Sequence, residues 1–99
     1  MKLKIGKKQY ILKYNVRTLI LYERITDKPF SIEGITEWAV LTYSALLAGT
    51  PGADIDLEEF LDDLTPDELT AAIDWLMKQL KIDRQVNGEK EESGEVKKK

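Results

Sequence analysis

The chain has 99 residues, of which 42% are hydrophobic and 33% charged, and its formal net charge at pH 7 is −3. It contains neither Cys nor His, which excludes disulfides, thiolate metal sites and catalytic sites of the Ser-His-Asp or Cys-His type. No apolar run approaches the roughly 18 residues of a membrane span and no signal-peptide pattern is present, so we expect a single cytoplasmic domain without membrane contact.

Residues 2–13 predict a β-hairpin. Gly6-Lys7 forms its two-residue loop, with Gly at the first central position of a type II′ turn. This register places Leu3 opposite Tyr10 and Ile5 opposite Lys8, so that apolar and polar side chains separate onto two faces. The face expected to meet the core holds Leu3, Ile5, Tyr10 and Leu12, and the solvated face holds Lys2, Lys4, Gln9, Ile11 and Lys13.

A helix of about three turns follows, with Asn15 as its N-cap and Thr26 near its end. Asp27-Lys28-Pro29 then breaks the helix. An apolar arc, expected to face the core, is formed by Val16, Leu19 and Ile20. Glu23 falls inside this arc, and its carboxylate therefore needs a cationic or hydrogen-bonding partner.

The next helix begins near Ile35, runs to about Ala48 and is apolar almost all round. Only Glu37 and Ser44 form a narrow polar strip. Such a helix is typical of a central element that is buried by several neighbours or by a partner. Breaker residues at positions 49–52 end it.

Two further helices are predicted by their capping residues. Asp56 caps a short helix over residues 57–64, and Thr65-Pro66 with Glu68 forms a capping box before a helix that reaches about Ile82. The long helix carries one apolar stripe, and Trp75 lies off it. The stripe consists of Leu69, Ala72, Ile73, Leu76, Met77 and Leu80. We expect one domain over residues 1–85 and a disordered, charged tail over residues 86–99.

The acidic residues do not form a convincing catalytic or metal site. The alternating carboxylates of residues 54–58 resemble the start of a calcium loop, but the required Gly is replaced by Glu59 and the required Glu by Thr65. The cluster of Asp62, Asp63, Asp67 and Glu68 is explained by its place beside a helix N-terminus. We therefore expect no catalytic residues, no metal, no cofactor and no enzymatic activity.

The charges are distributed asymmetrically along the chain. Residues 1–34 carry eight basic and three acidic side chains, a net of +5, whereas residues 35–85 carry three basic and eleven acidic ones, a net of −8. Opposed halves can pair within one fold or head-to-tail between copies, as in a self-assembling protein that forms rings or spirals. The basic hairpin could also contact nucleic acid, but a solvated strand face that discourages edge pairing explains it better.

The apolar excess of the helix over residues 35–48 and the off-stripe position of Trp75 predict a partner-binding surface. We expect four residues to form it: Trp38, Leu41, Trp75 and Met77. The alternative is that a domain of this size needs all of these side chains for its own core.

The first third of the chain resembles the small tail assembly chaperones of long-tailed bacteriophages. The resemblance lies in the strand, Gly turn and strand of residues 5–10, the aromatic-Glu pair Tyr22-Glu23, the break at Thr26-Asp27-Lys28 and the apolar Phe30. Asp27 stands where that family more often has Gly. A second helix rich in aromatic residues and acidic C-terminal helices also fit the family.

The resemblance implies a non-enzymatic role in the cytoplasm of the bacterial host. Such chaperones coat apolar helical stretches of the tape-measure protein, deliver it for tail-tube assembly and are absent from the finished virion. The expected fold is α+β, with an N-terminal β-hairpin packed on a bundle of about four helices. The expected mechanism is burial of the partner's apolar helical stripe in a groove.

Overall fold

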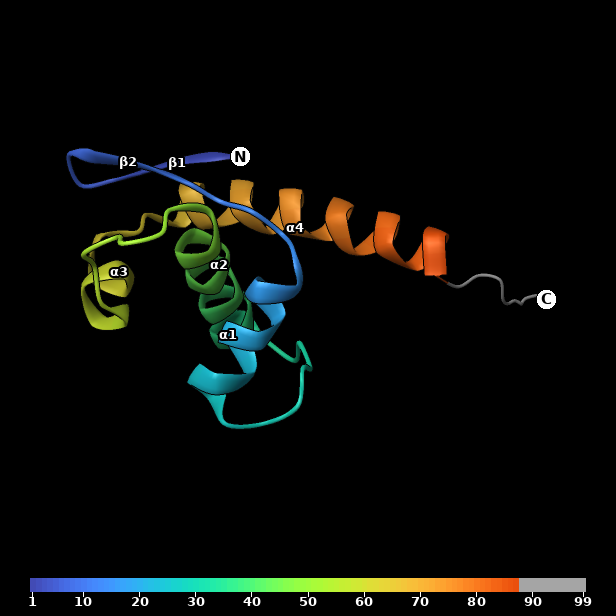
Figure 1. Cartoon of the computed structure of the whole chain (residues 1–99). Coiled ribbons are helices and arrows are strands. Elements are labelled where there is room, and N and C mark those ends of the chain that lie inside the picture. Colours follow the sequence, from blue (N-terminus) through green and yellow to red (C-terminus); the bar gives the residue numbers. More distant parts are fainter. Residues whose placement is uncertain (88–99) are drawn as a thin grey trace.

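The structure is a computed structural model that describes residues 1–87. It has the expected α+β fold, in which an N-terminal hairpin packs on four helices (Figure 1). In chain order the elements are β1 (Lys2–Ile5), β2 (Lys8–Ile11), α1 (Val16–Thr26), α2 (Ile35–Gly49), α3 (Leu57–Asp63) and α4 (Pro66–Asn87). Residues 88–99, most of the expected tail, lie outside the described part.

The hairpin has the predicted register. Leu3 pairs with Tyr10 and Ile5 with Lys8 across an antiparallel ladder. Gly6, the first residue of the loop, has a φ of 62°. Lys7, the second, does not have a positive φ, because Asp27 is the only non-glycine residue among residues 1–87 that does. A positive φ at the first loop position alone is what a type II′ turn requires. Leu3, Ile5, Tyr10 and Leu12 are all buried, which confirms the predicted core face.

The exit from the hairpin is fastened to the C-terminal end of α2. The Thr50 hydroxyl accepts a hydrogen bond from the Ile11 backbone N–H at 2.8 Å and donates one to the Ile11 carbonyl at 3.0 Å. The Lys13 N–H donates to the Ala45 carbonyl at 3.1 Å. A Cβ atom at Gly49 would collide with the Ile11 carbonyl, so glycine is what lets α2 approach β2 this closely.

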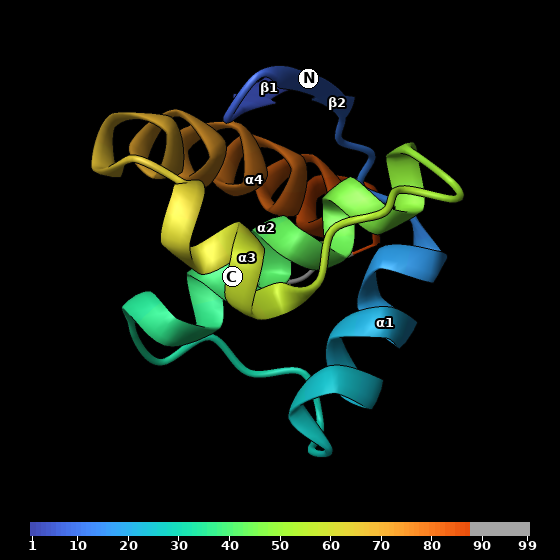
Figure 2. The same ribbon diagram turned by 90° about the vertical axis from the view of Figure 1, so that its left-hand side faces the viewer.

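Helix α2 is the central element, as predicted, and the other three helices and β2 contact it (Figures 1 and 2). Residues 39–46 are all buried, and Leu41, Ala45 and Leu46 have no exposed surface. The expected polar strip does not reach solvent at Ser44, which is also fully buried. Its hydroxyl instead donates to the Val40 carbonyl at 2.9 Å, and this bond satisfies the group inside the core.

Of the apolar arc predicted for α1, only Leu19 is partly buried, and the other two residues face solvent. Val16 is 70% exposed and Ile20 45% exposed, whereas Thr18 and Tyr22 are fully buried. The capping box explains this rotation, because Thr18 donates to the Lys13 carbonyl at 2.6 Å and exchanges hydrogen bonds with Asn15. The N-cap at Asn15 and the helix end at Thr26 agree with the prediction.

The caps predicted for the last two helices are present. Asp56 accepts a hydrogen bond from the Glu59 N–H at 2.8 Å at the start of α3. Thr65 and Glu68 form the reciprocal pair of a capping box at the start of α4, with distances of 3.0 and 3.2 Å. Helix α4 continues to Asn87, beyond the end expected near Ile82, and its last turns extend past the body of the molecule (Figure 1).

Candidate partner-binding groove

An open groove of about 420 Å³ lies between α4 and the start of α2. The loop that joins α1 to α2 forms one wall, the first turn of α2 contributes to the floor, and the middle of α4 forms the other wall. The residues that line it are Ile32, Glu33, Gly34, Trp38, Met77, Leu80 and Lys81. We call this the Trp38 groove. Its lining combines apolar side chains with one acidic and one basic residue.

Two of the four predicted partner-binding residues meet in the Trp38 groove. Trp38 is half-buried, and Met77, on the opposite wall, is 45% exposed. Leu41 has no exposed surface and therefore presents no side-chain atoms to a partner in this structure. Trp75 is half-buried and packs against both apolar clusters of the core, so its position off the stripe does not make it an exposed side chain.

Leu41 and Trp75 instead belong to the packing next to the groove. Tyr22, Val40, Leu41 and Leu76 form a buried apolar cluster. Ile32 and Trp38, which line the groove, are partly buried and pack against this cluster. Trp75 packs against it as well. The groove residues Ile32 and Trp38 are therefore held from below by a close-packed core, and a partner would meet a preformed surface.

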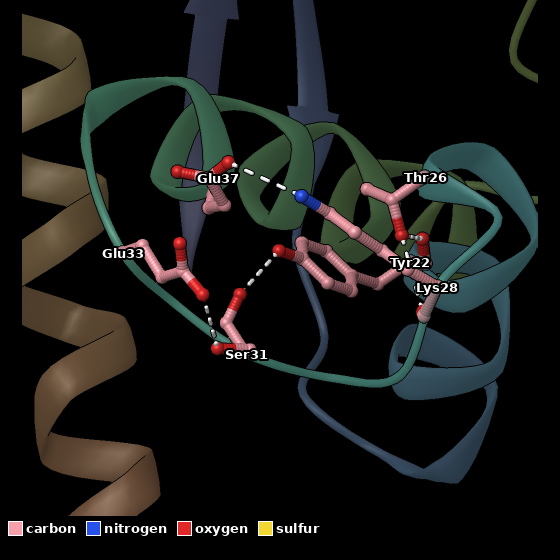
Figure 3. Close-up of polar contacts among 6 residues, drawn as sticks. All are labelled: Tyr22, Thr26, Lys28, Ser31, Glu33 and Glu37. Carbon is pink, nitrogen blue, oxygen red and sulfur yellow. Dashed lines mark hydrogen bonds and ion pairs between the residues drawn. The ribbon is translucent and has the colours of Figure 1, made fainter.

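The loop wall of the groove is fixed by the residues that carry the sequence pattern described above. The Tyr22 hydroxyl donates a 2.7 Å hydrogen bond to the Ser31 carbonyl (Figure 3). The Phe30 ring packs edge-on against Tyr22, with 5.3 Å between ring centroids. The Glu23 carboxylate accepts a hydrogen bond from the Phe30 N–H at 2.9 Å, which supplies the partner that this carboxylate was predicted to need.

The start of the same loop is held by a left-handed turn at the end of α1. Asp27 has φ 57° and ψ 37°, the conformation for which glycine is preferred after a helix. The Thr26 hydroxyl donates to the Tyr22 carbonyl at 2.8 Å and to the Lys28 carbonyl at 3.4 Å (Figure 3). Lys28 then lies 3.8 Å from the Glu37 carboxylate, which ties the loop to the first turn of α2.

The pKa values of Tyr22 and Tyr43 are raised, and both shifts have a structural explanation. Burial raises the pKa of Tyr22, and the nearby carboxylates of Glu37 and Glu33 raise it further. Burial, followed by the charge of Asp56, raises the pKa of Tyr43. The Tyr43 hydroxyl donates to the Ile55 carbonyl at 2.8 Å, as Tyr22 does to Ser31. Both phenols act as neutral donors that hold loops.

A second groove, of about 430 Å³, lies where α2, α3 and α4 meet. Its lining is almost entirely apolar and comprises Ile35, Thr36, Ala39, Val40, Leu61, Leu64, Thr65, Pro66 and Leu69. We call this the Leu61 groove. None of the four predicted partner-binding residues lies in it. The exposed Ile35 and Leu61 are the large apolar side chains that make this groove accessible.

The charged groups outside the grooves are solvated. The hairpin lysines at positions 2, 4, 7, 8 and 13 are exposed, and the acidic residues that precede and begin α4 cap its N-terminus or face solvent. Among the side chains that the structure describes, those of residues 1–81, no cluster of acidic groups is arranged to hold a metal ion. No helix in the same range is both long enough and apolar enough to cross a membrane.

The sequence did not reveal the loop side of the Trp38 groove. Ile32 and Gly34 lie in a segment without helical or strand periodicity, so no pattern marks them as lining residues. Leu80 belongs to the apolar stripe of α4, and it lines the groove because α2 covers only part of that stripe.

Comparisons of the chain with protein-family models, with curated proteins and with solved structures found no match.

Proposed function

We propose that this protein is a bacteriophage tail assembly chaperone that binds apolar helical segments of the tape-measure protein in the host cytoplasm. The single observation that carries the proposal is the Trp38 groove, which is lined by two predicted contact residues, Trp38 and the partly exposed Met77. In this role the protein is a binding module without catalytic activity.

The shape and chemistry of the groove suit an amphipathic helix. Ile32, Trp38 and Leu80 offer apolar surface, and Glu33 and Lys81 supply charges that can orient a helix with polar flanks. The unbranched, polarisable side chain of Met77 can adapt to differently shaped partners. This property matters for a chaperone that must cover many unlike stretches of a long helical protein.

The resemblance and the groove support the proposal together because residues of the resembling pattern hold the loop that forms one wall of the groove. The pattern that runs from Tyr22 to Phe30 is the set of contacts that holds the loop in place, and the loop supplies one wall of the groove. A sequence pattern concentrated in these positions is what we expect if the shape of that wall matters for binding.

The proposal is tested by titrating the protein with an apolar, helical tape-measure fragment. The Trp75→Phe variant leaves Trp38 as the only tryptophan, so its fluorescence reports directly on occupation of the groove. Truncating a buried aromatic anchor typically costs 2 kcal/mol or more, so Trp38→Ala should weaken binding by roughly 30-fold or more. Met77→Ala should weaken it by a smaller factor.

Ile11→Ala is the matched control. Ile11 is 48% exposed, close to the value for Met77, but it lies on the solvated face of the hairpin away from the groove. This variant should bind the fragment normally. If Trp38→Ala and Met77→Ala keep their folded circular dichroism spectra and bind as tightly as the Ile11 control, the site is wrong. If the unmodified protein fails to bind any apolar tape-measure helix, the function is wrong.

A further inference from the structure

Strand β1 forms an open edge of the hairpin. The Leu12 N–H donates to the Met1 carbonyl at 2.7 Å, and the Met1 amino group donates back to the Leu12 carbonyl at 3.3 Å. In an antiparallel pair, residues that exchange such bonds alternate with residues whose N–H and C=O groups point away from the partner strand. In the observed register, Lys2 and Lys4 are therefore the β1 residues whose backbone groups point outward, away from β2.

The two edges of the hairpin differ. On β2, the same alternation turns the backbone groups of Ile11 outward, and the Thr50 hydroxyl bonds to both of them. Within the described part of the chain, no hydrogen bond joins the backbone of Lys2 or Lys4 to another element. The sheet has two strands, and in Figure 2 no helix or strand continues it beyond β1. The β1 edge therefore has donors and acceptors that a further strand can use.

The side chains along this edge are basic. Lys2 and Lys4 lie on the solvent face of the hairpin, are exposed, and form no ion pair with any residue whose side chain is described. Leu3, between them, is buried on the opposite face. Like charges directly opposite one another on neighbouring strands repel, and opposite charges attract. The edge thus disfavours pairing with the β1 edge of a second copy and favours a strand that carries carboxylates.

We propose that β1 binds an extended acidic peptide segment of a partner protein as a third strand. Two acidic side chains, two residues apart in the peptide, face Lys2 and Lys4, and the residue between them lies on the face of Leu3. Backbone hydrogen bonds supply the affinity of such strand addition, and alternate side chains supply its selectivity. The Trp38 groove takes no part in this contact, so the inference stands apart from the proposed chaperone function.

The backbone of the edge favours a peptide over a nucleic acid. Phosphate groups accept hydrogen bonds but do not donate them, so a nucleic acid uses the N–H groups of Lys2 and Lys4 and leaves their carbonyl groups unused. The solvent face of the hairpin, which consists of Lys2, Lys4, Gln9, Ile11 and Lys13, also has no aromatic side chain on which a base stacks. A peptide strand matches both the donors and the acceptors of the edge.

The first test titrates the protein with a fluorescently labelled peptide, Thr-Glu-Val-Glu-Val-Thr, and follows its anisotropy. A second peptide has lysine in place of both glutamates. The acidic peptide should bind and the basic peptide should not. In ¹H–¹⁵N spectra of labelled protein, the acidic peptide should shift the Lys2 and Lys4 amide signals most, because these N–H groups exchange water for a peptide carbonyl.

Charge reversal tests the selectivity of the edge. The double variant Lys2→Glu with Lys4→Glu replaces two attractions by two repulsions, so it should bind the acidic peptide about fourfold more weakly or worse and should gain binding of the basic peptide. Lys8→Glu with Lys13→Glu is the matched control. It changes the net charge equally at two exposed positions outside β1, and it should bind the acidic peptide within about twofold of the unmodified chain.

A proline tests the backbone contribution. Lys4→Pro removes the outward-pointing N–H and leaves the bonds between β1 and β2 intact, which is the place in a sheet where proline is tolerated. Lys4→Ala removes the same charge but keeps the N–H. The proline variant should bind the acidic peptide about fivefold more weakly than the alanine variant. If it loses its folded circular dichroism spectrum, the amide shifts of the unmodified chain decide the backbone contact.

Four outcomes overturn the inference. The first is an acidic peptide that does not bind, or that shifts amide signals elsewhere and leaves those of Lys2 and Lys4 unchanged. The second is a control pair at Lys8 and Lys13 that weakens binding as much as the β1 pair, which would indicate nonspecific attraction. The third is a folded proline variant that binds like the alanine variant. The fourth is a single-stranded oligonucleotide that binds the lysines of β1 more tightly than the peptide does.

Discussion

Replacement of Tyr22 by Phe tests whether one hydrogen bond fixes the wall of the Trp38 groove. The substitution removes the hydroxyl that donates to the Ser31 carbonyl at 2.7 Å but keeps the ring that packs against Phe30. A hydrogen bond of this kind contributes about 0.5–1.5 kcal/mol to stability. Because Ser31 is exposed and water can replace the lost donor, we expect a loss of about 1 kcal/mol.

The assay is urea unfolding followed by circular dichroism, with a thermal scan in parallel. A loss of about 1 kcal/mol should lower Tm by roughly 4–8 °C in a domain of this size. Tyr10→Phe is the matched control, because Tyr10 is also buried but its hydroxyl has no hydrogen bond to any described residue. This control should change stability by no more than a few tenths of a kcal/mol.

The same variant has a defined pH dependence. The pKa of Tyr22 is raised above its ordinary value of 10.0, so the unfolded chain loses this proton at a lower pH than the folded chain does. The contribution of Tyr22 to stability is therefore complete below about pH 10 and is lost as pH rises through the folded-state pKa. The difference in stability between the unmodified protein and Tyr22→Phe should shrink over that range, whereas Tyr43 contributes equally to both.

Two results would refute this reasoning. If Tyr22→Phe is as stable as Tyr10→Phe near neutral pH, the hydrogen bond to Ser31 does not hold the loop. If the stability difference stays constant through the alkaline range, the buried phenol is not linked to folding. A loop that has lost this bond should also bind a tape-measure fragment less tightly, because Ile32 follows Ser31 directly into the groove.

Three further substitutions test particular backbone positions. Asp27→Gly should stabilise the protein by about 0.5–1 kcal/mol in urea unfolding, because glycine adopts the left-handed conformation without strain, whereas Asp27→Ala should not stabilise it. Gly49→Ala should destabilise it by about 3 kcal/mol, the upper end of the usual cost of overpacking, in the same assay, because the added Cβ collides with the Ile11 backbone. Thr65→Ala should lower Tm, with a cost of about 1 kcal/mol, since it removes the acceptor for the Glu68 N–H at the start of α4.

Local chemistry was sufficient to predict much of the fold. The hairpin register follows from a two-residue loop with Gly6 and from the alternation of apolar residues on either side of it. The caps at Asn15, Asp56 and Thr65 depend on side chains that reach the backbone only three residues away. Such interactions need no information from the rest of the chain, and the structure contains each of them.

The rotation of α1 could not be predicted in the same way. Its apolar residues suggested a core-facing arc that includes Val16 and Ile20, but the structure buries Thr18 and Tyr22 instead. Both buried residues are polar, and each is satisfied by a carbonyl outside the helix, at Lys13 and Ser31 respectively. Hydrophobic periodicity does not register a polar side chain whose burial is compensated by a distant partner.

The fold separates the four residues predicted to contact a partner. The apolar excess of α2 drew attention to Trp38, and the adaptable chemistry of methionine drew attention to Met77; both residues line one groove. The apolar excess also points to Leu41, and the position off the apolar stripe points to Trp75, yet the fold uses both in its own packing. Whether an apolar side chain is covered depends on which elements cross it, and no local pattern contains that information.

The sequence by itself determined the elements of this protein, because turns, caps and strand alternation arise from neighbours in the chain. Only the tertiary structure decided which apolar surfaces remain open. Helix α4 crosses α2 so that a groove remains beside Trp38 and another beside Leu61, and α1 is turned so that Val16 and Ile20 face solvent. Exposure is a property of how the elements pack together, and it therefore appears only when all of them are in place.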